Sequence, residues 1–515
     1  MSENSNSGPS FINPILRPFA RKSVERIEEE HAGSDLKRSL GALNLVFFGI
    51  GTIIGTGIFV LTGRAAAQFA GPGIMISFVI TGVLCALVAL CYAELASTIP
   101  VSGSAYSYSY ASIGELGAWV MGLLLILEYG LAASTVAVGW SGYVASFLHD
   151  FGIDIPAALR AAPGVEVTDF VTGAVVGVGV VNLPAIGVSE SATVNNVIVV
   201  IKVSVVIAFI AIGWGYVKPE LWHPLIPAQV PPPPAGSDTS LWGQISRALL
   251  EVWNGTNTSQ YGIGGLITGA ATIFFAYIGF EAVSTAGAES KNPKRDLPIG
   301  ILGSLAICTV LYILTAGVLV GIVPYTDLND PAPIAKAVNQ IGLPWFASVV
   351  KIGAICGLSS VMLVLLYGQT RIFYTMARDG LLPGFFSNVH PRFKTPWINT
   401  ILVGMLAAGF AGFKGLNDLA NLTNVGTLAA FIIVCFTVIY LRVARPGVSR
   451  PFRTPLFPVT PILGALMCFV LLKTLLTNPT TKSFFLLYLG FGVVVYFLYG
   501  VWFTKLGRGK VAGSK

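Results

Sequence analysis

Charged side chains are scarce in this sequence of 515 residues: Asp, Glu, Lys and Arg together make up 11% of it. Soluble domains typically carry about 25% charged residues. Hydrophobic residues, by contrast, make up 54% of the chain. This balance excludes an ordinary soluble protein and predicts an integral membrane protein, for which lipid is the main solvent.

Histidine and cysteine are also rare, with four and six residues. All six cysteines fall in predicted membrane spans and none has CxxC spacing, so we expect neither disulfides nor a metal site. The histidines lie in predicted loops or tails, and the sequence has no P-loop and no G-x-S-x-G motif. We therefore expect no catalytic residue, no cofactor and no enzymatic activity.

Long apolar runs make up most of the sequence, and twelve of them are long enough to cross a bilayer as helices. They cover residues 41–63, 72–99, 114–147, 168–186, 192–215, 263–288, 298–323, 343–377, 397–413, 418–441, 458–477 and 483–505. The predicted fold class is therefore an all-α integral membrane protein with 12 transmembrane helices.

The distribution of Lys and Arg predicts the orientation of these helices. With the N-terminus inside, 21 basic residues fall in inner segments and eight in outer ones, as the positive-inside rule requires. We expect both termini to be cytoplasmic and the protein to lie in the bacterial inner (plasma) membrane. The net charge of +7 then reflects topology and contact with anionic lipid, and we expect no nucleic-acid partner.

Two apolar segments contain glycines that weaken the helix in mid-membrane: GIGTIIGTGIF at 49–59 and FFAYIGFEAVSTAG at 274–287. Lipid penalises freed backbone groups unless they face protein, water or a ligand. Two broken helices about half a chain apart favour the central site of a transporter. The alternative is that the glycines merely permit close helix packing.

A split helix offers free N–H groups on one side of the break and free carbonyl groups on the other. The N–H groups suit a carboxylate and the carbonyls suit an ammonium, so two adjacent breaks can hold a zwitterionic amino acid. The predicted N–H donors are Thr56 and Gly57. The predicted carbonyl acceptors are Ile53, Phe275, Ala276 and Ile278.

Four motifs carry a family resemblance: the two segments above, CYAELASTIPVSGSAYSY at 91–108 and YGQTRIFYTMARDGLLP at 367–383. They resemble the amino acid–polyamine–organocation superfamily, and within it bacterial members of the cationic amino acid transporter family. The resemblance covers about residues 36–505. It implies alternating access around broken helices 1 and 6, and an aromatic cap at Phe280 that covers the substrate from the outside.

The resemblance also implies a five-plus-five inverted repeat (LeuT-like) followed by two extra helices. The expected units are a cytoplasmic tail (1–35), a first repeat (36–215), a long extracytoplasmic loop (216–262), a second repeat (263–441) and the last two helices with a tail (442–515).

Two ionisable residues lie deep within predicted spans, Glu128 and Lys202, and intramembrane charges favour a function. Relatives suggest that Lys202 couples proton movement to transport; the alternative is a permanently charged tether. Two interpretations of Glu128 are equally favoured. Either it lines the substrate pocket or shuttles a proton, or it is a protonated residue that forms a hydrogen bond between helices.

We therefore expect a secondary active transporter of L-amino acids, most simply a proton-coupled symporter for small or medium neutral ones. The substrate and membrane lipids are the expected partners. An exchanger for arginine, lysine or polyamines is the alternative. A receptor or channel on the same scaffold is disfavoured, because the sequence has no output module and a broken-helix site argues against an open pore.

Overall fold

The computed structural model describes residues 17–22, 40–101, 103–155, 191–234, 237–257, 259–390 and 396–506. Across these residues the chain is helical and forms no β-strand; two isolated β-bridges join Leu40 to Ser290 and Val230 to Gln260. Some helices are long: α13 (Pro293–Ile322) has 30 residues and α15 (Pro344–Arg378) has 35. The described chain is thus all-α.

The other long helices are α4 (Ile74–Thr98), α6 (Glu115–His149), α10 (Ser191–Trp214), α16 (Trp397–Phe413), α17 (Leu416–Ala444), α18 (Val459–Leu475) and α19 (Pro479–Val495). The interrupted helices consist of α2 (Ala42–Ile53), η2 (Gly57–Leu61), α3 (Thr62–Ala65) and η3 (Ala66–Ala70), and of α12 (Gly262–Ile273), η6 (Phe274–Tyr277) and η7 (Glu281–Glu289). Shorter elements are η1 (Arg17–Phe19), η4 (Gly71–Gly73), α5 (Ser104–Ser112), η5 (Pro219–Trp222), α11 (Leu241–Asn254), η8 (Tyr325–Asp327), α14 (Pro333–Gln340), η9 (Gly384–Ser387), η10 (Tyr496–Gly500) and α20 (Val501–Phe503).

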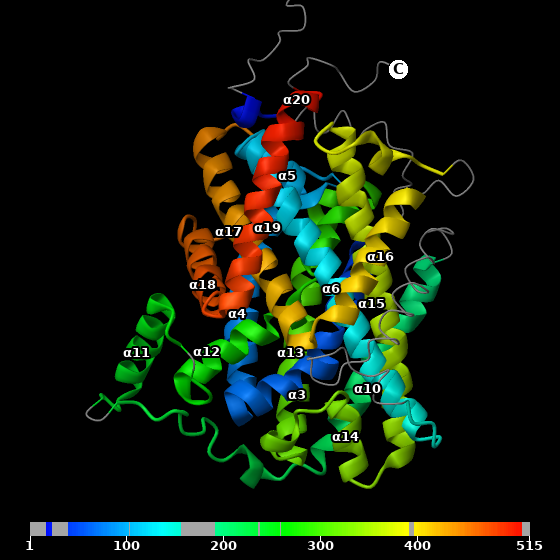
Figure 1. Cartoon of the computed structure of the whole chain (residues 1–515), viewed down its shortest axis with the longest axis vertical. Helices are drawn as coiled ribbons and strands as arrows, with labels where there is room; N and C mark the ends of the chain where they lie inside the picture. Colours follow the sequence, from blue (N-terminus) through cyan, green and yellow to red (C-terminus); the bar gives the residue numbers. More distant parts are fainter. Residues whose placement is uncertain are drawn as a thin grey trace, which may run out of the picture.

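The helices form an elongated bundle in which most of them run along the long axis (Figure 1). Elements η1 and α20 lie at one end, here called the proximal end, and α3 and α14 lie at the opposite, distal end. Within the described residues, eight segments are long and apolar enough to cross a membrane, and α2, α16 and α18 are shorter apolar helices. The all-helical, apolar architecture predicted from the sequence is confirmed.

Each predicted span that falls within the described residues coincides with a helix, continuous or interrupted. The fourth, at 168–186, lies outside the described residues, so the total of twelve stays a prediction. Most of the predicted tail at 1–35 also lies outside them. The prediction missed α5 and α14, and it treated 216–262 as a loop of little structure, whereas α11 occupies 14 of those residues.

Glycines bring neighbouring helices into close contact around the first interrupted helix. A Cβ added to Gly49 of α2 would lie 2.3 Å from the Ser304 hydroxyl oxygen of α13. On the facing helix, a Cβ on Gly300 would lie 2.7 Å from Leu45 Cβ. Small residues at such contacts are what helix packing in membranes favours. Helix α13 therefore holds α2 firmly and fixes where α2 ends.

Candidate functional site

The two interrupted helices touch at their breaks. A Cβ added to Gly57, the first residue of η2, would lie 2.2 Å from the Ala276 Cα in η6. Gly279 has a φ of +119°, and a Cβ there would lie 2.9 Å from the Thr52 carbonyl carbon. The Thr52 hydroxyl donates to the Gly279 carbonyl at 2.9 Å. Only glycine allows backbones to approach this closely, so these two glycines place the breaks side by side.

Side chains from two other helices bind the carbonyl end of the first break. The fully buried Lys202 ammonium of α10 donates to the Gly51 carbonyl and, at 3.1 Å, to the Ile54 carbonyl. The Tyr312 hydroxyl of α13 donates to the Ile53 carbonyl at 2.7 Å. The last carbonyls of a helix have no partner within it, and here Lys202 and Tyr312 supply the donors.

The other side of this break carries an unpartnered polar group. The Thr56 hydroxyl is fully buried and has no hydrogen-bond partner. Its side chain packs on Gly139 of α6, where an added Cβ would lie 2.6 Å from Thr56 Cγ2. The helix that resumes at Gly57 also starts with N–H groups that have no intrahelical acceptor. Such an end suits an anionic group, as predicted for Thr56 and Gly57.

The second break is bound largely by its own residues. The Gly279 N–H donates to both carboxylate oxygens of Glu281, at 2.9 and 3.1 Å. The Ile278 N–H donates to the Phe275 carbonyl at 3.3 Å. Phe275, Ala276 and Ile278 are all buried, and they face the first break through the contact between Ala276 and Gly57. The structure thus brings together the backbone groups that the sequence singled out.

Asn424 of α17 binds the end of α12, just before the second break. Its side-chain N–H groups donate to the carbonyls of Ala271 and Thr272 at 2.8 and 3.2 Å. Its own carbonyl oxygen is buried without a partner. A neutral amide therefore occupies the position at α12 that the Lys202 ammonium occupies at α2.

Glu128 of α6 is fully buried, and neither carboxylate oxygen has a hydrogen-bond partner. Glu281 and Thr427 lie beside it. The hydroxyl of Tyr92, another fully buried group in this region, also has no partner. Unsatisfied buried polar atoms are uncommon in proteins, and a cluster of them indicates a place for water or a polar ligand.

Phe280, the predicted aromatic cap, belongs to an aromatic cluster. Its ring centroid lies 5.9 Å from that of Tyr92 and 5.3 Å from that of Phe431. Tyr92 lies six residues before the end of α4 at Thr98. The ring is completely buried.

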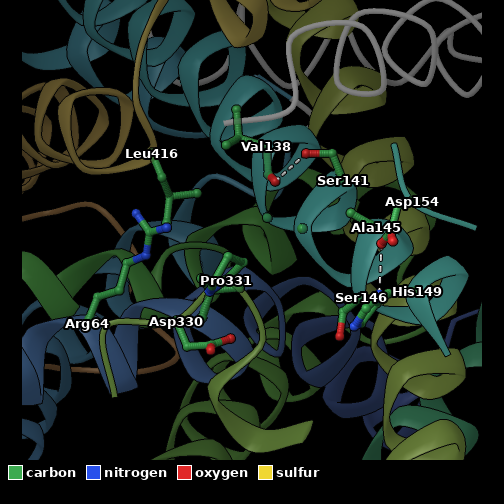
Figure 2. A pocket seen from close by; sticks show the side chains of 13 residues that line it. Arg64, Val138, Ser141, Ala145, Ser146, His149, Asp154, Asp330, Pro331 and Leu416 are labelled. Carbon is green, nitrogen blue, oxygen red and sulfur yellow. Dashed lines mark hydrogen bonds and ion pairs between the residues drawn. The ribbon is translucent and has the colours of Figure 1, made fainter. Parts of the chain in front are cut away.

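A cavity of about 360 Å³ leads from the distal end toward the first break. Gly139, the residue on which Thr56 packs, lies in its wall together with Val60. Figure 2 shows Arg64 and Asp330 on one side of the cavity and a hydrogen-bonded His149–Asp154 pair on the other. The cavity is therefore rimmed by charged side chains and reaches Gly139, the residue on which Thr56 packs.

Sequence comparisons agree with this architecture. A family profile described as amino acid permease matches residues 40–498. This chain belongs to the amino acid permease family. It is therefore a membrane transporter of the amino acid–polyamine–organocation superfamily rather than an enzyme, as the sequence motifs indicated.

Three relatives show the range of the family around this permease. The methylthioribose transporter of Bacillus subtilis is 44% identical over 484 residues, which cover 93% of this chain and 97% of the relative. The branched-chain amino acid permease BcaP of the same organism is 42% identical over 496 residues, 95% of this chain and 99% of the relative. Human cationic amino acid transporter 4 is 31% identical over 455 residues, 86% and 66% of the two chains.

At the proximal end of the permease, residues 17–22 contribute an ionic contact with the end of α15. Lys22 pairs with Asp379 at 2.7 Å, and the Tyr106 hydroxyl donates to the other Asp379 oxygen at 2.8 Å. Lys22 and Tyr106 are buried. The structure thus has a cavity at the distal end and a packed ionic contact at the proximal end.

A second ionic cluster joins α4 and α17 at the proximal end. Glu94 accepts two hydrogen bonds from Arg442, at 2.8 and 2.5 Å, and one from the Thr454 N–H at 2.8 Å. Arg450 lies 3.5 Å from the same carboxylate. Glu94 thus links α4 to α17 and to Thr454 through an ionic cluster.

The permease uses several residues at the breaks that sequence reasoning missed, namely Thr52, Gly139, Tyr312 and Asn424. Asn424 could have been identified from the sequence, because an amide in the middle of the apolar segment 418–441 needs hydrogen-bond partners. Tyr312 and Gly139 gave none, since tyrosine and glycine are ordinary residues in membrane helices.

Proposed function

We propose that this permease carries small or medium neutral L-amino acids together with protons by alternating access. The observation that carries the proposal is the contact between two helix breaks inside the bundle, with Lys202 on the carbonyl end of one of them. A cavity at one end and ionic contacts at the other support a transporter that opens to one side at a time.

In this proposal the substrate lies across the two breaks. Its carboxylate accepts hydrogen bonds from the N–H groups of Thr56 and Gly57 and from the unpartnered Thr56 hydroxyl. Its ammonium donates to carbonyls around the breaks. The proposed acceptors are those of Ile53, Phe275, Ala276 and Ile278. Ile53 and Phe275 already accept one hydrogen bond each, which leaves one lone pair for a ligand.

Lys202 is proposed to carry the coupling proton. Its charged form donates to the Gly51 and Ile54 carbonyls and so occupies the place of a bound cation at the end of α2. Loss of that proton removes the charge that neutralises the helix end. The first break is then free to rearrange, which links proton release to movement of the substrate-binding residues.

Glu128 is proposed to assist as a second proton-binding group. Two carboxyl groups buried near each other in a low-dielectric interior repel when both are charged, so protonation of one of them stabilises the pair. The Gly279 N–H already binds the Glu281 carboxylate, whereas the Glu128 oxygens have no hydrogen-bond partner, so Glu128 is the group proposed to bind the proton.

A neutral substrate is favoured by the aromatic and aliphatic surroundings of the breaks and by the relative named for branched-chain amino acids. An exchanger for cationic substrates is the second candidate, because several relatives at 31–37% identity are named as cationic amino acid transporters. Because one relative is named a methylthioribose transporter, this uncharged sugar should also be tested as a substrate.

The topology proposed for this function has twelve spans, both termini in the cytoplasm and a bacterial plasma membrane location. The five-plus-five repeat of residues 36–215 and 263–441, joined by the outer loop 216–262, belongs to the same proposal. Support comes from the basic residues at the proximal end, among them Lys22, Arg371 and Arg442.

The decisive experiment is uptake of labelled leucine, methylthioribose and arginine into proteoliposomes with and without an inward proton gradient. Leucine accumulation that requires the gradient supports the proposal. Arginine uptake that ignores the gradient and depends on internal arginine would replace the symporter with the exchanger. Gradient-driven uptake of methylthioribose alone would support proton coupling but would replace the amino acid with methylthioribose as the substrate.

A further inference from the structure

Helix α11 is capped at both ends by residues next to it in the sequence. The Ser240 side chain accepts a hydrogen bond from the Gly243 N–H at 3.0 Å, and Gly255 closes the helix with a φ of +72°. The Asp238 carboxylate accepts from the Ser240 N–H at 2.8 Å, which lowers the pKa of Asp238. These are the caps expected of a surface helix that is independently folded.

The surface of α11 is divided into three sectors. Ala248 and Val252 are buried in the contacts with α12 and α18. A second sector next to the buried one carries large exposed apolar side chains, with Trp242 78% and Trp253 66% exposed; Leu249 and Leu250 belong to it as well, and Ser246 is the polar residue within it. The remaining sector is polar and contains Gln244, Arg247, Glu251 and Asn254. An exposed apolar sector opposite a polar one is typical of a helix that lies in a membrane interface.

The position of α11 matches such an interface. The helix lies outside the bundle, beside α12 and toward the distal end (Figure 1). The Trp253 ring lies 6.2 Å from the ring of Phe469 on α18. Phe469 is six residues before the end of α18 at Leu475, which is about 9 Å along a helix with a rise of 1.5 Å per residue.

The exposed sector of α11 is also continuous with an apolar surface of α18. Ile462, Leu463, Leu466 and Phe469 of α18 are exposed, as the lipid-facing side of a membrane helix is. Trp253 extends this surface from α18 onto α11. Tryptophan is the side chain that membrane–water interfaces favour most clearly, and α11 contributes two.

We propose that α11 is an interfacial helix whose Trp242–Trp253 sector lies in the lipid leaflet at the distal end of the bundle. The partner is the lipid surface itself, at the boundary between head groups and acyl chains. Arg247 and Glu251 of the polar sector, 3.9 Å apart, are half-buried and then lie away from the acyl chains, and Arg247 also donates to Gln229. Since residues 255–261 connect α11 directly to α12, the helix ties one half of the second interrupted helix to the membrane surface.

Spin labels on single cysteines test this placement in the full-length permease. The native cysteines are buried except for the half-buried Cys356, so a Cys356→Ser background suits the labelling. Trp242→Cys and Leu250→Cys report on the apolar sector, and Asn254→Cys is the matched control on the polar sector. Each protein is placed in phosphatidylethanolamine–phosphatidylglycerol vesicles, and relaxation by oxygen is compared with relaxation by a water-soluble nickel chelate.

We expect the ratio of oxygen to chelate accessibility to be at least ~threefold higher for Trp242→Cys and Leu250→Cys than for Asn254→Cys. Equal ratios with free access of the chelate would place α11 in water and overturn the proposal. Exclusion of both reagents from the apolar sector, with spin–spin broadening, would assign that sector to a contact between two copies and overturn it equally. Two labelled positions keep the test valid when one variant does not fold.

Discussion

The two helix breaks lie side by side, yet the protein stabilises them by opposite means. At the first break, donors from distant helices bind the carbonyl end of α2: the Lys202 ammonium and the Tyr312 hydroxyl. At the second break, a carboxylate two residues along the chain binds the Gly279 N–H. A cation thus binds free carbonyls, and an anion binds a free N–H group.

The two breaks therefore differ in how freely each can move relative to the other helices. Glu281 and Gly279 belong to the same short segment, so they can move together without losing the hydrogen bonds between them. Lys202 reaches the first break from α10, so any movement of α2 relative to α10 must stretch or break those bonds. The first break therefore depends on the charge of one remote residue, which is why the proposed coupling resides there.

The largest expected effect comes from removing that remote charge. We expect Lys202→Met to lose gradient-driven leucine accumulation completely while it retains leucine counterflow, because the site persists without its proton-binding group. Proteoliposome uptake with and without the gradient measures both. Lys351→Met is the matched control, since this buried lysine pairs with Asp150 at 2.7 Å near the distal end of α6. Undiminished gradient-driven accumulation in Lys202→Met would remove Lys202 from the coupling mechanism.

The next largest effect tests the contact between the breaks. Gly57→Ala forces a methyl group against the Ala276 Cα, so we expect the KM for leucine to rise at least ~tenfold, equivalent to about 1.4 kcal/mol. Gly55→Ala is the control, because its Cβ would meet only the Val361 side chain at 3.3 Å. Initial rates over a leucine concentration series give KM. Equal KM values for the two variants would show that the Gly57 backbone does not form the binding site.

A smaller effect distinguishes the two buried carboxyl groups. Glu281→Gln weakens the hydrogen bonds from Gly279 N–H, and we expect it to lower the free energy of unfolding by about 2 kcal/mol. Glu128→Gln removes no hydrogen bond within the protein and should leave stability nearly unchanged. Thermal unfolding of both purified variants in detergent makes the comparison. A larger loss for Glu128→Gln would mean that Glu128 stabilises the fold and does not serve the site.

The smallest effect concerns the Ile53 carbonyl. Tyr312→Phe removes one hydrogen bond, which contributes about 1 kcal/mol to stability. We expect saturating leucine to restore part of that loss, because the substrate ammonium is proposed to bind the same carbonyl. Tyr488→Phe also removes a tyrosine bond to a carbonyl, that of Leu123 at 2.8 Å, but away from the breaks. Melting temperatures with and without leucine compare the two, and equal recovery in both would exclude Ile53 as a ligand.

Sequence reasoning located both breaks because the physical cause is local. Glycines at 55, 57 and 279 weaken a helix wherever they occur, and the apolar surroundings place them inside a membrane. The depth of Lys202 was equally predictable, since a helix rises by a fixed amount per residue. Helix α11 was missed, although Ser240 and Gly255 are recognisable end signals, because the loop around it is rich in proline and polar residues.

By itself, then, the sequence determined an all-α membrane protein with two interrupted helices, a deep lysine and a deep glutamate. Only the tertiary structure decided which groups meet: Lys202 with Gly51 and Ile54, Asn424 with the end of α12, and Trp253 with α18. The reason is that helix formation and lipid burial follow from neighbouring residues and composition. A hydrogen bond between residues about 150 positions apart depends on how whole helices pack.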